Sequence, residues 1–147
     1  MQVNKDIYEQ AAEYLQSRGL MASTSKEQAI KTVGWYAANA YLIIVQDGEK
    51  IGGVCLARSI DKDTPAEAEA FSHKPDGDTA WVQEAAADSK DFIQMFYFKV
   101  PSLMKSGKMK RLPKYFGWRR SNMVPRYYSV DTVYKHTRTN KQKEEQL

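Results

Sequence analysis

The stretch YLIIVQDGEKIGGVCLARSI, residues 41 to 60, decides the fold of this chain. Its two halves are rich in β-branched and apolar residues and predict two strands. The dipeptide Asp47-Gly48 between them is typical of a tight hairpin turn, whose central positions favour φ > 0. An antiparallel hairpin is therefore expected over these residues.

Two amphipathic helices are expected before this hairpin. Residues 5–18 carry apolar side chains at helical spacing, with Asn4 or Asp6 as the N-cap. Residues 23–40 repeat that spacing, and Thr24 and Glu27 are three residues apart, as in a capping box.

The segments after the hairpin predict a loop, a strand, a helix and a second hairpin. Residues 61–79 are polar, contain two prolines and are interpreted as a long exposed loop. AWVQEAAA, residues 80–87, is expected to be a buried strand, followed by a helix at about residues 89–106 with Asp88 or Ser89 as its cap. The aromatic and β-branched segments around residues 121–123 predict the last hairpin.

This order of elements predicts an α+β fold: a mixed, mostly antiparallel sheet flanked by helices. The helix between the third and fourth strands is a crossover, which requires those two strands to be parallel. Residues 1–135 are expected to form a single domain, and residues 136–147, which have little apolar content, a flexible basic tail.

Composition favours a globular intracellular protein. The 147 residues contain no apolar run near the roughly 20 residues that a membrane-spanning helix needs, so no membrane partner is expected. Cys55 is the single cysteine and cannot form an internal disulfide. The expected location is the cytoplasm.

Charged residues are distributed unevenly along the chain. Residues 1–91 hold nine Lys/Arg and fifteen Asp/Glu, whereas residues 92–147 hold thirteen and three. The basic surplus in the last third points to an anionic partner, such as a nucleic acid, an anionic cofactor or an acidic protein.

The hairpin at residues 41–60, together with a strand that runs directly into a capped helix at AWVQEAAADSKD, resembles the GNAT (Gcn5-related N-acetyltransferase) family. The likeness is to divergent members common in phages and mobile elements, in which a basic-aromatic strand such as WRR follows the helix. The resemblance implies an acyl-CoA-dependent N-acyltransferase, or a degenerate relative of one, with an amine as acyl acceptor. It also implies a phage or mobile element as the source, and a phage-encoded protein could be associated with the virion.

The resemblance also implies where acetyl-CoA would bind. Family members hold its pyrophosphate at the strand-to-helix junction, which here corresponds to Ala86, Ala87, Ser89 and Lys90. Backbone N–H groups at a helix start attract phosphate. The family's glycine-containing pattern is replaced here by QEAAADSKD, and the Asp88 carboxylate is expected to weaken the affinity for phosphate.

By the same resemblance, Glu84 would be the general base, and Tyr127 or Tyr128 would return a proton to the leaving thiolate. The alternative is that Glu84 faces outward from a strand and that the tyrosines are half-buried sheet residues. A non-catalytic module that binds nucleic acid or protein through a basic C-terminal sheet is the second hypothesis for function.

For that second hypothesis, Arg119, Arg120 and Arg126 are the candidate nucleic-acid-binding residues. They lie among aromatic residues that could stack on bases, although a solvated charged face is the alternative interpretation. Strand alternation sends Arg119 and Arg120 to opposite faces, so only one of them is expected to act together with Arg126.

Cys55 is interpreted as a small core residue rather than a nucleophile. The only histidines are His73 and His136, and their spacing from Cys55 is not that of a zinc site, so no metal is expected.

Overall fold

The computed structural model describes residues 6–62, 72–88, 92–119 and 125–129. The expected tail at residues 136–147 lies outside these ranges. In order along the chain, the described elements are α1 (Ile7–Ser17), α2 (Lys26–Asn39), β1 (Tyr41–Asp47), β2 (Lys50–Ile60), β3 (Thr79–Ala87), α3 (Phe92–Lys105), β4 (Tyr115–Arg119) and β5 (Pro125–Ser129).

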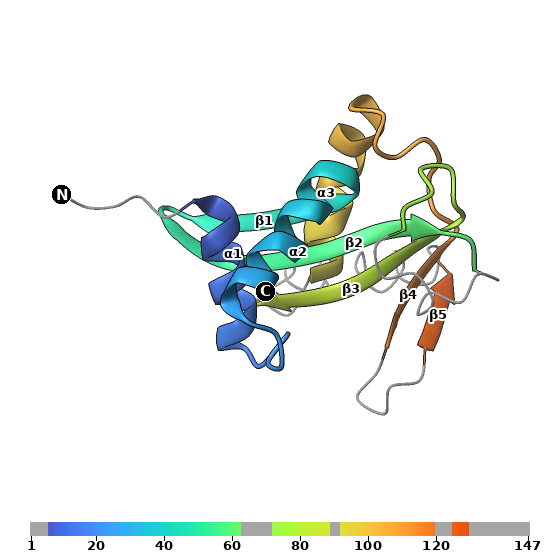
Figure 1. Cartoon of the computed structure of the whole chain (residues 1–147). Coiled ribbons are helices and arrows are strands. Elements are labelled where there is room, and N and C mark those ends of the chain that lie inside the picture. Colours follow the sequence, from blue (N-terminus) through green and yellow to red (C-terminus); the bar gives the residue numbers. More distant parts are fainter. Residues whose placement is uncertain (1–5, 63–71, 89–91, 120–124, 130–147) are drawn as a thin grey trace, which may run out of the picture.

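The strands form one five-stranded sheet in the order β1-β2-β3-β4-β5. Every neighbouring pair is antiparallel except β3 and β4, which are parallel and are joined by the α3 crossover. Helices α1 and α2 lie on one face of the sheet and α3 on the other (Figure 1). The expected α+β class and mixed sheet are confirmed, including the last hairpin as part of the same sheet.

The first hairpin forms as expected, but its turn lies one residue further along. Asp47 pairs with Lys50 across the hairpin, so the loop residues are Gly48 and Glu49 rather than Asp47 and Gly48. Gly48 has φ +65°, a backbone conformation that glycine adopts at little cost. Asp47 is thus the last residue of β1.

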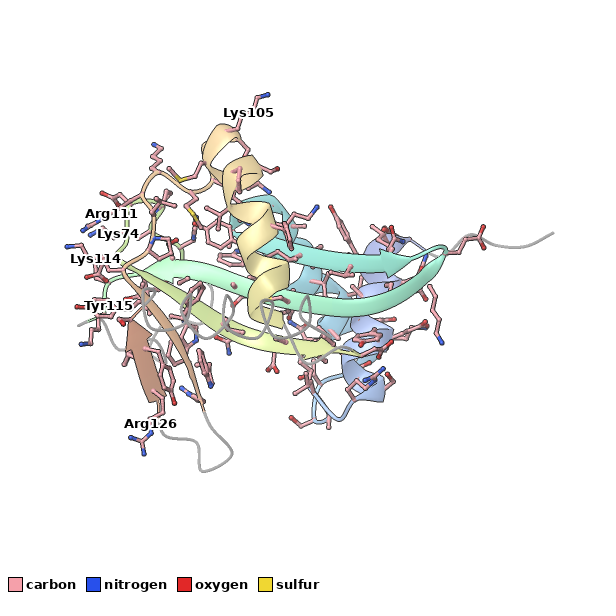
Figure 2. The ribbon with its side chains drawn as sticks, turned by 180° about the vertical axis from the view of Figure 1, so that it is seen from behind. Lys74, Lys105, Arg111, Lys114, Tyr115 and Arg126 are labelled. Atoms are coloured by element: carbon pink, nitrogen blue, oxygen red, sulfur yellow. The ribbon has the colours of Figure 1, made fainter. Side chains whose placement is uncertain are left out.

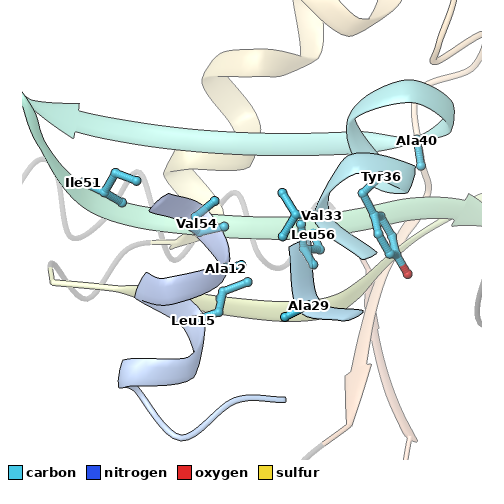
Figure 3. Close-up of a cluster of buried hydrophobic side chains, with 10 residues drawn as sticks. Ala12, Leu15, Ala29, Val33, Tyr36, Ala40, Ile51, Val54 and Leu56 are labelled. Carbon is cyan, nitrogen blue, oxygen red and sulfur yellow. The ribbon is translucent and has the colours of Figure 1, made fainter. Parts of the chain in front are cut away.

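The two faces of the sheet bury separate apolar clusters. The cluster beneath α1 and α2 is shown in Figure 3; its fully buried members include Ala12, Leu15, Ala29, Val33, Tyr36, Val54 and Leu56. The cluster on the α3 face contains Tyr41, Ile43, Cys55, Ala57, Ala80, Val82, Val100, Met109 and Phe116. Cys55 is fully buried, which confirms its interpretation as a core residue.

Two helix starts differ from the prediction. The Ser25 hydroxyl accepts a hydrogen bond from the Gln28 N–H at 3.1 Å, so Ser25 caps α2 and the capping box expected from Thr24 is wrong. Helix α3 begins at Phe92, which is too far along for Asp88 to cap it. The Asp6 cap of α1 is confirmed by its bond from the Tyr8 N–H.

The described part of the loop before β3 packs against the sheet, so residues 72–78 are not the exposed loop that composition predicted. The Nδ1 atom of His73 accepts a hydrogen bond from the Ser59 N–H at 3.0 Å. Its Nε2 lies 2.9 Å from the Lys108 carbonyl oxygen. Because a carbonyl oxygen only accepts hydrogen bonds, Nε2 is the protonated nitrogen of the ring and donates this bond. A neutral His73 therefore joins β2 to the segment between α3 and β4.

This arrangement predicts a pH dependence of stability. Burial lowers the pKa of His73 below its ordinary value of 6.5. The folded state then binds fewer protons than the unfolded state, so the stability from His73 is fully present above pH 6.5 and is lost as pH falls through the lowered pKa. We expect the free energy of unfolding, measured by denaturant titration from pH 8 to 5, to decline more steeply in the parent than in His73→Gln. Equal slopes in the two proteins would contradict this role of His73.

Candidate functional site

A pocket lies where β3 and β4 diverge. The two strands pair only where Thr79–Trp81 of β3 lie beside Tyr115–Gly117 of β4. Beyond these residues the described parts of β3 and β4 are not paired with each other. Figure 1 shows β4 turning away from β3 at this point. The pocket has a volume of about 230 Å³ and is lined by Leu20, Trp81, Val82, Gln83, Glu84, Ala85, Trp118 and Arg119.

A β-bulge in β3 determines which side chains reach this pocket. Leu56 pairs with Glu84 and Ala57 pairs with Val82, so Gln83 is the extra residue. A bulge of this kind breaks the simple alternation of faces. As a result, Trp81 and Glu84 lie on the same face of the sheet, three residues apart.

Glu84 has an environment suited to accepting a proton. Its side chain is half-buried on the face of the sheet that α1 and α2 cover, and burial raises its pKa above the usual 4.5. Burial also raises the pKa of Tyr36 to about 12; the Arg58 charge lowers this pKa by a smaller amount, and the Glu84 charge raises it. A carboxyl group with a raised pKa in a pocket is a candidate acid or base.

Arg119 and Arg126 lie on opposite faces of the last hairpin. Arg126 pairs with Trp118, whose ring packs against the α3-face cluster, and Arg119 is the next residue along β4. Arg119 lines the pocket and Arg126 is exposed. These two arginines do not form a common anion-binding face, and Arg120 lies outside the described residues.

Neither expected acid lines the pocket, although each packs against a tryptophan that does. The Tyr127 ring lies 5.9 Å from the Trp81 ring, and the Tyr128 ring stacks on Trp118 at 4.7 Å. Gly117 permits the first contact, because a Cβ atom at this position would come within 2.8 Å of Trp81 and 2.9 Å of Tyr127. The two tyrosines thus support opposite walls of the pocket.

The expected phosphate-binding junction is engaged in other contacts where it is described. Ala86 and Ala87 are paired with Val54 and Gly53 of β2. The Asp88 carboxylate accepts a hydrogen bond from the Tyr14 hydroxyl at 2.9 Å and forms an ion pair with Arg18. Asp88 therefore ties the end of β3 to α1. Ser89 and Lys90 lie outside the described residues.

Comparison with known proteins adds no identification. No family model matches the chain, and neither a curated protein nor a solved structure is significantly similar to it. Among the described helices, none is long and apolar enough to cross a membrane. The described residues likewise contain no group of three or more His, Cys, Asp or Glu side chains placed to hold a metal ion.

Proposed function

We propose that this chain is an acyl-CoA-dependent N-acyltransferase of GNAT type, or a degenerate relative of one, in which the pocket between β3 and β4 brings the amine to the thioester. One observation carries the proposal. The half-buried Glu84, with a raised pKa, lines a pocket that opens where two parallel strands diverge next to a bulge.

Glu84 is the group that accepts the proton of the acceptor amine. A primary amine has an ordinary pKa of about 10.4, so it is mostly protonated at neutral pH and must lose a proton before its nitrogen can attack. A positioned carboxylate supplies this step directly or through one water molecule. Tyr127 and Tyr128 receive no part in it, because neither lines the pocket.

Acyl-CoA would supply the acyl group as a thioester, which breaks at its C–S bond when the amine nitrogen forms the new C–N bond. The nitrogen loses its second proton to water as the tetrahedral intermediate collapses. A thiol has an ordinary pKa of about 8.5, so the sulfur can leave as a thiolate and take a proton from water. Beyond Trp81 and Gly117 the two strands are not paired with each other, and their backbone N–H and C=O groups would be available to hydrogen-bond the amide-containing arm that carries the thioester. The phosphate end fits less well, because the junction lacks glycine and Asp88 is bound to Arg18.

The other residues that line the pocket would hold the amine in place. Trp81, Trp118 and Leu20 offer apolar surface that excludes water from the reacting groups. Arg119 brings a positive charge to the same pocket and would favour an acceptor that carries an anionic group beside its amine.

The test is release of free thiol from acetyl-CoA in the presence of primary amines, followed with a chromogenic thiol reagent. Cys55 should not interfere, because it is the only cysteine and burial raises the pKa of its thiol to about 12. We expect amine-dependent thiol release, with the acetylated amine identified by mass spectrometry. A rate that does not change when amine is added, over a broad set of amines, would refute catalysis and leave only the degenerate relative.

A further inference from the structure

The segment from α3 to β5 carries an unusual excess of positive charge. Residues 92–129 contain nine Lys/Arg and no Asp or Glu. We propose that five exposed cations from this segment form a binding surface for single-stranded nucleic acid, separate from the pocket and independent of the proposed acyl transfer. We name it the basic edge; its residues are Lys105, Lys110, Arg111, Lys114 and Arg126.

The basic edge follows one side of the molecule. Figure 2 shows Lys105 at the end of α3, Arg111 and Lys114 on the segment that leads to β4, and Arg126 on β5. Backbone hydrogen bonds hold the middle of this line in place, since the Lys110 N–H donates to the Pro75 carbonyl at 2.8 Å and the Lys114 N–H donates to that of Asp78 at 2.7 Å. The charges are therefore presented by a fixed backbone.

These cations are available to a partner. All five are exposed, and in the part of the chain that the structure describes none of them forms an ion pair. By contrast, Arg18, Lys26 and Lys74 each form an ion pair with a carboxylate.

Two nearby carboxylates, Asp61 and Asp78, are engaged in hydrogen bonds. The hydrogen bond from Lys74 lowers the pKa of Asp61, and the Arg111 charge also contributes to this lowering. Asp61 accepts from Lys74 at 2.5 Å, and Asp78 accepts from the Lys62 N–H and the Thr79 hydroxyl at 2.9 and 2.8 Å. Asp76 is exposed on the turn between them. A polyanion would gain contacts with the basic edge without displacing these two carboxylates from their hydrogen bonds.

Exposed apolar side chains favour a single strand over other anionic partners. Phe98 is 76% exposed and lies on the same side of α3 as Lys105, seven residues and about 10 Å along the helix. Leu112, between Arg111 and Lys114, is 59% exposed. Single-strand-binding surfaces combine cations that follow the phosphates with aromatic rings that stack on unpaired bases. An acidic protein surface would form ion pairs with the cations but has no nucleic-acid bases to stack on the Phe98 ring.

The experiment measures fluorescence anisotropy of labelled 20-nucleotide single-stranded DNA and RNA across a salt series. Arg111→Gln/Lys114→Gln removes two cations from the basic edge, and Lys31→Gln/Lys50→Gln is the matched control with the same net charge. Because each phosphate contact contributes about 0.7 to the salt slope for a single strand, we expect the first variant to lose about 1.4 from the slope and to bind about 20-fold more weakly at 0.1 M salt. The control should retain the parental slope.

Phe98→Ala separates base stacking from charge. We expect at least a fivefold loss of affinity for the single strand with an unchanged salt slope, since stacking does not release counterions. Undetectable binding at low salt, equal slopes in the two double variants, or no effect of Phe98→Ala would each overturn the proposal. Tighter binding of polyglutamate than of the oligonucleotide would also overturn it and would indicate an acidic protein partner instead.

Discussion

Replacing Glu84 with glutamine is expected to lower kcat/KM for amine acylation by roughly 100- to 10,000-fold, the range that a positioned general base contributes. Glutamine keeps the size of the side chain but cannot accept the amine proton. The rates are compared as thiol release under conditions where the parent is linear in enzyme concentration. Glu49→Gln is the matched control, because Glu49 is exposed in the β1–β2 turn, far along the sheet from the pocket.

The pH profile identifies the group responsible. Because burial raises the pKa of Glu84, the parental rate should fall as pH drops through that raised value, and Glu84→Gln should lack this acidic limb. A variant with both the parental rate and the parental limb would show that another group is the base.

Loss of activity in Glu84→Gln should come without loss of stability. A carboxyl whose pKa is raised by folding stabilises the protein below its unfolded pKa, and this contribution is lost as pH rises through the folded value. The ionised Glu84 therefore carries a cost at pH 7 that glutamine avoids. We expect the variant to unfold at a higher denaturant concentration than the parent at pH 7, and a lower midpoint would contradict the assigned environment of Glu84.

Gly77→Ala is expected to destabilise the fold by about 1–3 kcal/mol, as overpacking of a tight site does. A Cβ atom on Gly77 would lie 2.6 Å from the carbonyl oxygen of Ile60 and 2.9 Å from its nitrogen. Both are backbone atoms at the end of β2, so no side-chain rotation can relieve the contact. The measurement is the free energy of unfolding from denaturant titration.

Gly34→Ala is the control for this substitution. Gly34 lies within α2, where its nearest neighbour to a new Cβ is a Tyr8 ring carbon at 3.9 Å. Alanine is favoured over glycine inside a helix by up to about 1 kcal/mol, so this variant should be more stable than the parent. A Gly77→Ala variant as stable as the parent would contradict the packing of residues 72–78 against β2.

Local sequence patterns were sufficient to predict the elements of the fold. Apolar and β-branched runs on either side of a turn signal predicted β1 and β2, helical spacing predicted α1 and α2, and the single crossover predicted a parallel pair between β3 and β4. The errors are at boundaries that neighbouring contacts decide. Ser25 rather than Thr24 caps α2, and the β1–β2 turn begins at Gly48 rather than Asp47.

The pocket required information that no local pattern contains. The sequence singled out Glu84, but the bulge at Gln83, which places Glu84 on the same face as Trp81, depends on register with β2. Arg119 was interpreted as an anion-binding residue of the hairpin, yet it lines the pocket. Gly117 offered a signal, because glycine inside an aromatic strand is typical of a close approach by another group.

The packing of residues 72–78 was missed for a related reason. Composition predicted an exposed loop here, but the hydrogen bonds of His73 to Ser59 and Lys108 join segments 14 and 35 residues apart. Such contacts depend on the completed sheet and not on the local sequence.

The most direct test of the account is a backbone amide NMR titration of the protein with coenzyme A. Binding of the thiol-bearing arm between β3 and β4 should shift the amide signals of residues 82–87 and 118–119, and these shifts should be retained in Arg111→Gln/Lys114→Gln. Shifts confined to residues 105–114, or none at all at millimolar coenzyme A, would contradict the proposed acyl-transfer site.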